Sequence, residues 1–282
     1  MSKYLTFFLL LFCSIFVQAY PILNSLEKSY QSKKYSDLTN YLDGLRDNST
    51  KDLHYSSMNI IDREIIDGYY EFKVEIEQNT RDETNTNISS VDRYFVSILR
   101  FENKIIHYRI EEKIYEQNLS EKWIEKFKLI KEKTDSSAYS DLENSYLEIY
   151  GAKLRFGDIF VDNVLYGSHC GFGGQDPVYR EQLNYFIQNK AKKDLQNWLV
   201  SATPELQLYA IDGILTLSKK GVRFKDETYA LIEVIANKEG NVNTCSGCTH
   251  WKTTIKSEVE ILLKKHDLSD QTSIRKATFQ RN

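Results

Sequence analysis

The first half of the chain changes the period of its hydrophobic pattern. Residues 22–47 carry apolar side chains at helical spacing, interrupted once, which predicts two helices joined by a short turn. Residues 56–77 and 93–116 instead alternate apolar and polar positions, as half-buried strands do, and a turn at 102–104 divides the second stretch into a hairpin. We therefore expect two helices followed by antiparallel strands.

The pattern around these strands is less regular. Residues 78–92 are polar and unpatterned, which predicts a mobile loop. Residues 120–133 return to a helical period after Ser120, a predicted N-cap. The apolar face of this predicted helix consists of Trp123, Ile124, Phe127 and Ile130. Residues 139–150 predict another helix and 157–167 an extended segment, so the first half is expected to be α+β, with helices packed on a small antiparallel sheet.

The second half reads as short helices in series. Asp176 and Pro177 begin the first of them, Thr203 and Pro204 begin the longest, and Gly221 ends it. The five predicted helical segments are 176–190, 191–201, 203–221, 225–240 and 255–266. Because helices this short cannot bury an apolar face alone, we expect them to stack in pairs, as in helical-repeat proteins.

The N-terminus predicts a cleaved secretory signal. An apolar run at residues 4–17 follows Lys3 and precedes the small residue Ala19, the expected cleavage point, and Cys13 would be lost with the signal. The run has about 14 residues, fewer than the ~20 that cross a bilayer, although a retained N-terminal anchor is the alternative. We expect a periplasmic or extracellular protein whose mature chain has no transmembrane segment.

Composition narrows the class of protein further. The formal net charge is −3 at pH 7, which gives no support to nucleic-acid binding because that function requires a basic surface. A chain of this length is more naturally two domains than one. The predicted divisions are a signal peptide at 1–19, an α+β domain at 20–165, a helical-stack domain with cysteine loops at 166–268 and a disordered tail at 269–282.

Three cysteines remain in the predicted mature chain: Cys170, Cys245 and Cys248. Cys170 lies in "SHCGFGG", after His169, and the other two lie in "TCSGCTH", before His250. In an exported protein the first interpretation is a disulfide, and a bridge from Cys170 to either later cysteine would close a loop of about 75 residues, worth roughly 4 kcal/mol.

Other chemistries remain open for these cysteines. Zinc could be held by the three thiolates with His250 or His169 as the fourth ligand, although a single CxxC is a weak zinc motif. Thiol redox exchange is a further possibility, but the CxxC does not follow a strand and begin a helix as in thioredoxin-like sites. A cysteine hydrolase using Cys170 and His250 is less favoured than a glycine-rich hinge at the same place.

One segment carries a resemblance to known sequences. The stretch from "CGFGGQDP" through "SATPELQLYAIDGILTLSKKG" to "NVNTCSGC", about 168–250, resembles uncharacterised secreted or periplasmic bacterial proteins with a Cys-Gly opening and a Cys-Ser-Gly-Cys loop. The helices around Pro204 also resemble a HEAT-type repeat. These resemblances imply a helical scaffold with no known activity, so the expected fold is α+β followed by an all-α HEAT-like stack.

The expected function is a non-enzymatic binding or scaffold protein of the bacterial envelope, with no cofactor. No general acid–base pair, catalytic triad or phosphate-binding loop stands out in the sequence, whereas helical stacks commonly present binding surfaces. A protein partner is expected rather than a small molecule. The alternative is a zinc-binding or thiol-redox protein that uses Cys170, Cys245 and Cys248.

Overall fold

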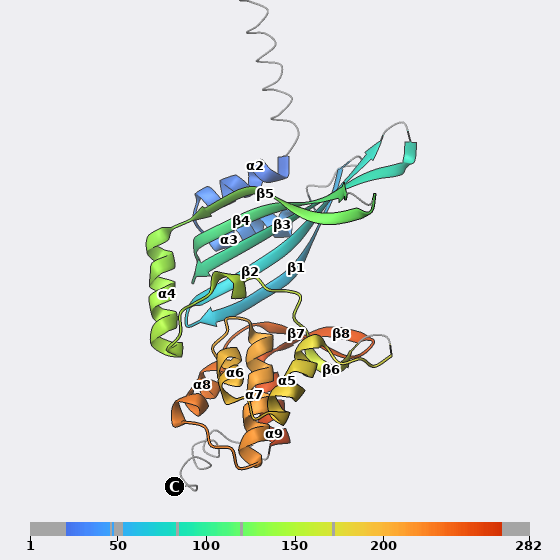
Figure 1. Ribbon diagram of the computed structural model, residues 1–282. Helices are drawn as coiled ribbons and strands as arrows, with labels where there is room; N and C mark the ends of the chain where they lie inside the picture. The colour runs from blue at the N-terminus through green and yellow to red at the C-terminus, as the bar shows by residue number, and fades with distance from the viewer. Residues whose placement is uncertain are drawn as a thin grey trace, which may run out of the picture. The chain divides into compact units, whose positions relative to one another are not determined.

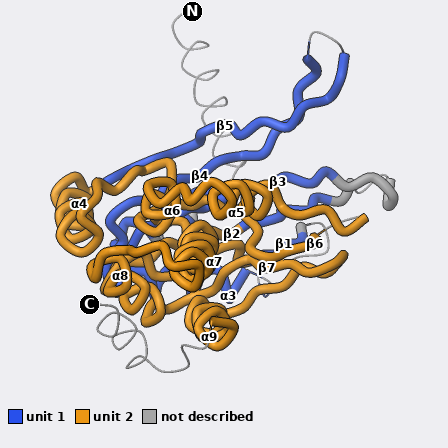
Figure 2. Tube along the Cα trace, turned by 60° about the horizontal axis from the view of Figure 1, so that its bottom comes forward, with its two compact units in different colours: residues 1–58, 75–134 blue, residues 59–74, 135–282 orange. Residues whose placement is uncertain are grey.

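The computed structural model describes residues 21–45, 47, 53–82, 85–118, 121–170 and 173–266. The predicted signal peptide, Cys13 and the predicted tail at 269–282 lie outside these residues. The chain forms two compact units, coloured separately in Figure 2. Unit 1 comprises residues 1–58 and 75–134, and unit 2 comprises 59–74 and 135–282. In the described part of the chain, no helix is long and apolar enough to cross a membrane.

Unit 1 begins with the predicted pair of helices, which the structure confirms. Helix α2 (Pro21–Gln31) and helix α3 (Tyr35–Gly44) are joined by a tight turn in which Lys33 has a positive φ of 55°. Both helices lie on one face of a sheet (Figure 1), where the rings of Tyr30 and Tyr108 are in contact. The apolar side of the hairpin therefore faces the strands.

The sheet is antiparallel and has five strands in the order β1-β2-β3-β4-β5. The strands are β1 (Leu53–Ile66), β2 (Tyr69–Asp82), β3 (Asn85–Phe101), β4 (Lys104–Gln117) and β5 (Trp123–Thr134). The predicted hairpin at 93–116 is confirmed as β3 and β4, with Val96 opposite Ile110 and Ile98 opposite Tyr108. Each strand lies beside its neighbour in sequence, as in a meander.

Two sequence predictions in unit 1 are wrong. Residues 78–92 form no long loop, because β2 runs to Asp82 and β3 begins at Asn85. Residues 123–134 form the edge strand β5 instead of a helix. Cross-strand pairing explains the second difference: Lys113 binds Glu125 and Glu116 binds Lys126, and these contacts with β4 are available only to an extended segment.

Unit 2 contains helices and a second, smaller sheet. Its helices are α4 (Ser136–Tyr150), α5 (Val178–Gln188), α6 (Lys192–Leu199), α7 (Pro204–Lys219), α8 (Asp226–Ala236) and α9 (Ile255–Lys265), with a short 3-10 turn η1 (Phe156–Asp158). Its strands are β6 (Tyr166–Cys170), β7 (Asn241–Gly247) and β8 (Thr249–Thr254). The five helices predicted after Pro177 are thus present.

The predicted fold class is nevertheless wrong. The five-stranded sheet of long strands dominates the N-terminal half, so it is not a small sheet under helices, and the C-terminal half is not an all-α HEAT-like stack. The stretch 241–251, interpreted from sequence as a loop, forms β7 and the first half of β8. Val242 and Cys245 are three positions apart among small polar residues, so the segment shows no apolar period of two that would identify a strand.

Helix α7 forms the core of unit 2. Thirteen of its 16 residues are buried, so it packs against neighbours on all sides. Gly213 lies where a Cβ would come within 2.6 Å of Leu195 Cδ2 and 2.7 Å of Leu183 Cδ1, so a larger residue would force these side chains of α6 and α5 to move. Helices α5, α6, α8 and α9 and the small sheet lie around α7 (Figure 1). This packing positions β6 and β7, the strands that carry Cys170 and Cys245.

Candidate functional site

The cysteines predicted from sequence do come together in part. Cys170, on β6, and Cys245, on β7, form a disulfide with a Cα–Cα distance of 5.6 Å. The two strands run parallel, with Gly167 opposite Cys245. A Cβ on Gly167 would lie 2.1 Å from the carbonyl oxygen of Cys245, so only glycine permits this approach beside the bridge. The bridge therefore fixes β6 to β7 at the edge of the small sheet.

Cys248 is exposed and is not part of this disulfide. It follows Gly247, whose φ is 59°, in the tight turn between β7 and β8, and His250 pairs with Cys245 across the hairpin. The sulfurs of Cys170 and Cys245 are bonded to each other, so they cannot serve as zinc thiolates or as a hydrolase nucleophile in this state. Among the described residues no group of three or more His, Cys, Asp or Glu side chains could hold a metal ion.

Asp176 does not act as the predicted helix cap. The N-cap of α5 is Pro177, and Asp176 Oδ1 instead accepts a hydrogen bond from the backbone N–H of His169 at 2.8 Å. His169 has a positive φ of 57°, so this bond holds the end of β6 in an uncommon conformation. The loop before α5 is thus tied back to the strand that carries Cys170.

A buried ion cluster lies beside the disulfide strands. Asp212 on α7 accepts hydrogen bonds from Arg180 at 2.7 Å and Lys265 at 2.8 Å, and His266 Nε2 lies 3.3 Å away. Burial alone would raise the pKa of Asp212, but the bonds from Lys265 and Arg180 outweigh it and hold this pKa below its ordinary value. Arg180 also donates to the carbonyl of Gly167, so the cluster connects α5, α7 and α9 to β6.

A second buried cluster centres on Arg63, which is 1% exposed. Its guanidinium donates to both carboxylate oxygens of Glu205, at 2.9 and 2.8 Å, and to Glu71 at 2.5 Å. The remaining nitrogen donates to the carbonyl of Val161, and the Asn243 N–H donates to Glu205. Burial lowers the pKa of Arg63, but the two carboxylates more than reverse this and raise it. The charged groups of this cluster are paired with one another, as in a structural ion network.

Three large apolar side chains of unit 1 are exposed on the edge strand β5. Trp123 is 67% exposed, Phe127 51% and Leu129 49%. The register places all three on the same face of the sheet, opposite Gln117, Lys113 and Glu111 of β4 respectively. Tyr115, 54% exposed, lies on that face between the first two, and Phe127 contacts the ring of Phe95 edge to face at 5.3 Å.

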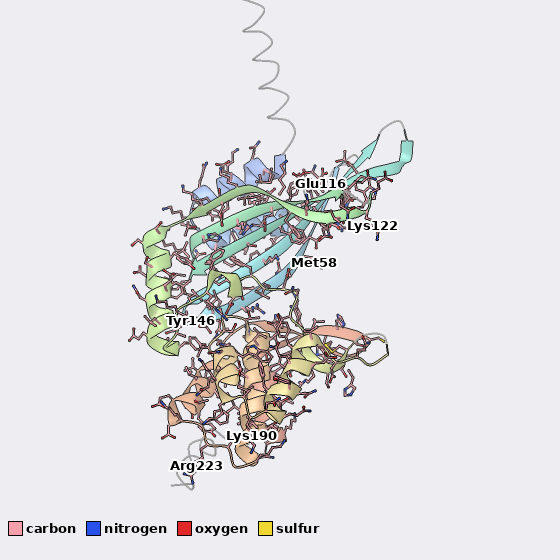
Figure 3. All side chains as sticks on the ribbon, viewed as in Figure 1. Met58, Glu116, Lys122, Tyr146, Lys190 and Arg223 are labelled. Carbon is pink, nitrogen blue, oxygen red and sulfur yellow. A yellow bond between two sulfur atoms is a disulfide. The ribbon has the colours of Figure 1, made fainter. Side chains whose placement is uncertain are left out.

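The other face of β5 is basic. Lys126, Lys128, Lys131 and Lys133 lie on it, because a bulge beside Ile110 shifts the register by one residue. This is the face that carries α2: Lys131 pairs with Glu27, and Lys133 lies 5.8 Å from the ring centre of Tyr30. We call the apolar set Tyr115, Trp123, Phe127 and Leu129, together with these four lysines, the β5 surface. Glu116 and Lys122, labelled in Figure 3, mark the end at which β4 turns into β5.

Sequence reasoning missed the β5 surface because it treated this stretch as a helix. Spacings of three and four residues put Trp123, Ile124 and Phe127 on one helical face, which was expected to be buried. In a strand Ile124 turns to the opposite face from the two aromatic residues. Lys126 and Lys128 alternate with Phe127 and Leu129, and this period of two was the signal that could have identified the strand.

Comparisons of this chain with protein-family models, with curated proteins and with solved structures found no match. Its function is therefore inferred from its own geometry.

Proposed function

We propose that this chain is an exported, non-enzymatic protein that binds another protein through the β5 surface. The observation that carries the proposal is the exposure of Trp123, Phe127 and Leu129 on one edge strand. Large apolar side chains gathered on one exposed element mark an interaction site, and aromatic residues are enriched in the centres of protein interfaces. The small sheet and the ion clusters then serve to hold unit 2 together.

Export is supported by two independent features. The N-terminal pattern ending at Ala19 is that of a secretory signal, and the Cys170–Cys245 disulfide is a bond that persists in oxidising compartments. Together they support an envelope or extracellular location. It also places the β5 surface where other exported proteins are its potential partners.

A photo-cross-linking experiment tests the proposal. In the producing cells, Trp123 is replaced by p-benzoylphenylalanine in one variant, and the exposed Tyr185 of α5 is replaced in a control variant. We expect a discrete protein adduct from position 123 that is absent from position 185. Adding Phe127→Lys to the first variant is expected to abolish the adduct. Adducts from both positions, from neither, or one that survives Phe127→Lys would contradict the proposal.

A thiol-redox role is the second candidate, because Cys248 is exposed three residues after a disulfide-bonded cysteine. Its thiolate could exchange with that bridge, as in other CxxC proteins. The activity is measured as catalysis of insulin reduction by dithiothreitol, and a role for Cys248 requires that Cys248→Ser abolish this catalysis. If the unaltered protein does not accelerate the reduction, this candidate is removed.

A further inference from the structure

The edge of β5 is open within the part of the chain that the structure describes. β5 is the last strand of the sheet, and β4 is its only strand neighbour there. Every second residue of an edge strand directs its backbone N–H and C=O away from the sheet, where another strand can pair with them. The 12 residues of β5 are long enough to pair with a full strand of a partner.

The two faces of this edge have different chemistry. One face carries Trp123, Phe127 and Leu129 together with Glu132 and Glu125, which pairs with Lys113, and the other face carries four lysines. Because successive residues of a strand point to opposite faces, a strand added to β5 would place alternate side chains beside each set. The apolar row favours apolar neighbours, and the basic row favours carboxylates.

We propose that the partner presents an extended segment in which acidic and apolar residues alternate, and that this segment adds to β5 as a sixth strand. The inference rests on the proposed function and specifies its partner. Lys126 and Lys128 already pair with Glu116 and Glu112 of β4, yet each ammonium has three donors and can bind a second carboxylate on its outer side. In the complex, Lys126 and Lys128 then lie between the glutamates of β4 on one side and the acidic residues of the added strand on the other.

Lysines on an edge strand also have a purely protective role, since they discourage the edges of two sheets from pairing. Protection does not explain why the same strand exposes a tryptophan, a phenylalanine and a leucine on its other face. A second copy of this chain fits poorly as the occupant, because β5 carries four lysines against Glu125 and Glu132, and two such strands would repel each other.

The test uses the purified full chain and end-blocked synthetic peptides of about nine residues, a usual strand length. One peptide alternates glutamate with valine and isoleucine. A second replaces each glutamate with lysine, and a third has the composition of the first in an order without alternation. We expect the first peptide to bind at least tenfold more tightly than either of the others, and more weakly at high salt.

Four substitutions locate the binding. Phe127→Lys alters the apolar face and Lys128→Glu the basic face, and both side chains are about half exposed, so the fold should tolerate the changes. Tyr185→Lys and Lys193→Glu are the matched controls at exposed positions of unit 2. We expect each β5 variant to weaken binding at least tenfold and each control to change it less than twofold. Equal losses in both pairs would overturn the inference.

Hydrogen exchange identifies the mode of binding. Strand addition is expected to slow amide exchange within 123–134 when the first peptide is added. Binding without that protection, equal binding of all three peptides, or no binding of the first peptide would overturn the inference.

Sedimentation of the chain alone tests whether a second copy of the chain occupies β5. A dimer that Phe127→Lys makes monomeric would assign β5 to that second copy and overturn the inference. If only the peptide arms fail while cross-linking from position 123 succeeds, the proposed function stands and this partner chemistry does not.

Discussion

His107 shows how one buried side chain couples stability to pH. It lies in β4, and its side chain is 1% exposed with Nδ1 2.8 Å from the hydroxyl of Thr134. Burial and, secondarily, the charge of Arg109 lower the pKa of His107 to about 4. Glu132 lies 3.9 Å from its Nε2, and this pairing does not reverse the shift.

The sign of the pH effect follows from this lowered pKa. Below pH ~6.5 the unfolded chain protonates this imidazole while the folded chain does not, so the free energy of unfolding falls as pH decreases from about 6.5 to about 4. His107 accounts for at most about 3 kcal/mol of that loss. In urea unfolding at a series of pH values, His107→Gln should flatten this part of the profile. The same substitution at the exposed His54 is the control, and equal slopes in the two variants would contradict the assignment.

Arg63 is a second residue whose replacement should measurably lower the free energy of unfolding. Arg63→Met leaves Glu205 and Glu71 buried without their cation, so we expect a loss of about 3–5 kcal/mol in the free energy of unfolding. Arg155→Met removes an ion pair in which the arginine is 66% exposed, and should change stability by less than ~1 kcal/mol. Denaturant titration compares the two.

A double variant separates charge from packing at the same site. Adding Glu205→Gln to Arg63→Met removes one of the uncompensated carboxylates, so it should recover part of the lost stability. If the two substitutions instead add without coupling, the ion network is not the source of the cost.

At the scale of elements, the disulfide gives the clearest prediction. The bridge between β6 and β7 spans 75 residues, and a loop of this size is worth about 4 kcal/mol through the entropy of the unfolded chain. Replacing both Cys170 and Cys245 with serine should lower the free energy of unfolding by about this amount, whereas Cys248→Ser should change it by less than ~0.5 kcal/mol.

Alkylation of the native protein without reductant checks the pairing directly. Only Cys248 among the three should be modified, because the other two are bonded to each other. Peptide mapping that finds Cys248 in a bridge with either of the others would refute this connectivity.

Elements with a pattern repeated along their own length were predictable from sequence. The alternation through Val96, Ile98 and Tyr108 gave the β3–β4 hairpin, and Pro204 with Gly221 framed α7. β5 and β7 were missed for different reasons. The period of two in β5 was hidden by helical spacings of three and four residues, whereas β7 depends on parallel pairing with β6, some 75 residues earlier.

The same contrast holds for the candidate sites. Cysteine spacing left Cys245 and Cys248 as equal candidates for Cys170, because only the register of β6 on β7 places Gly167 opposite Cys245. The β5 surface was hidden by a wrong period, since its aromatic residues looked like the buried side of a helix. Neither the Arg63 nor the Asp212 cluster could be found from sequence, because their members are separated by up to 142 positions.

On the scale of the whole molecule, the division into units predicts how fragments behave. A fragment of residues 135–282 contains every helix from α4 onward but lacks Arg63. It would have to bury Glu205 without its cation, at a cost of about 3–5 kcal/mol, so we expect it to show no cooperative thermal unfolding by circular dichroism. The same fragment with Glu205→Gln should recover part of its structure. Cooperative melting of the unaltered fragment near the temperature of the full chain would contradict this.

The chain passes between the two units three times, after residues 58, 74 and 134. Because each unit consists of two separate segments of the chain, a single recombination breakpoint in the gene cannot separate one complete unit from the other. A recombination event that joined residues 135–282 to another coding sequence would carry the disulfide and leave behind 59–74, the segment that neutralises Glu205. Selection on the stability of unit 2 therefore acts on codons in both halves of the gene.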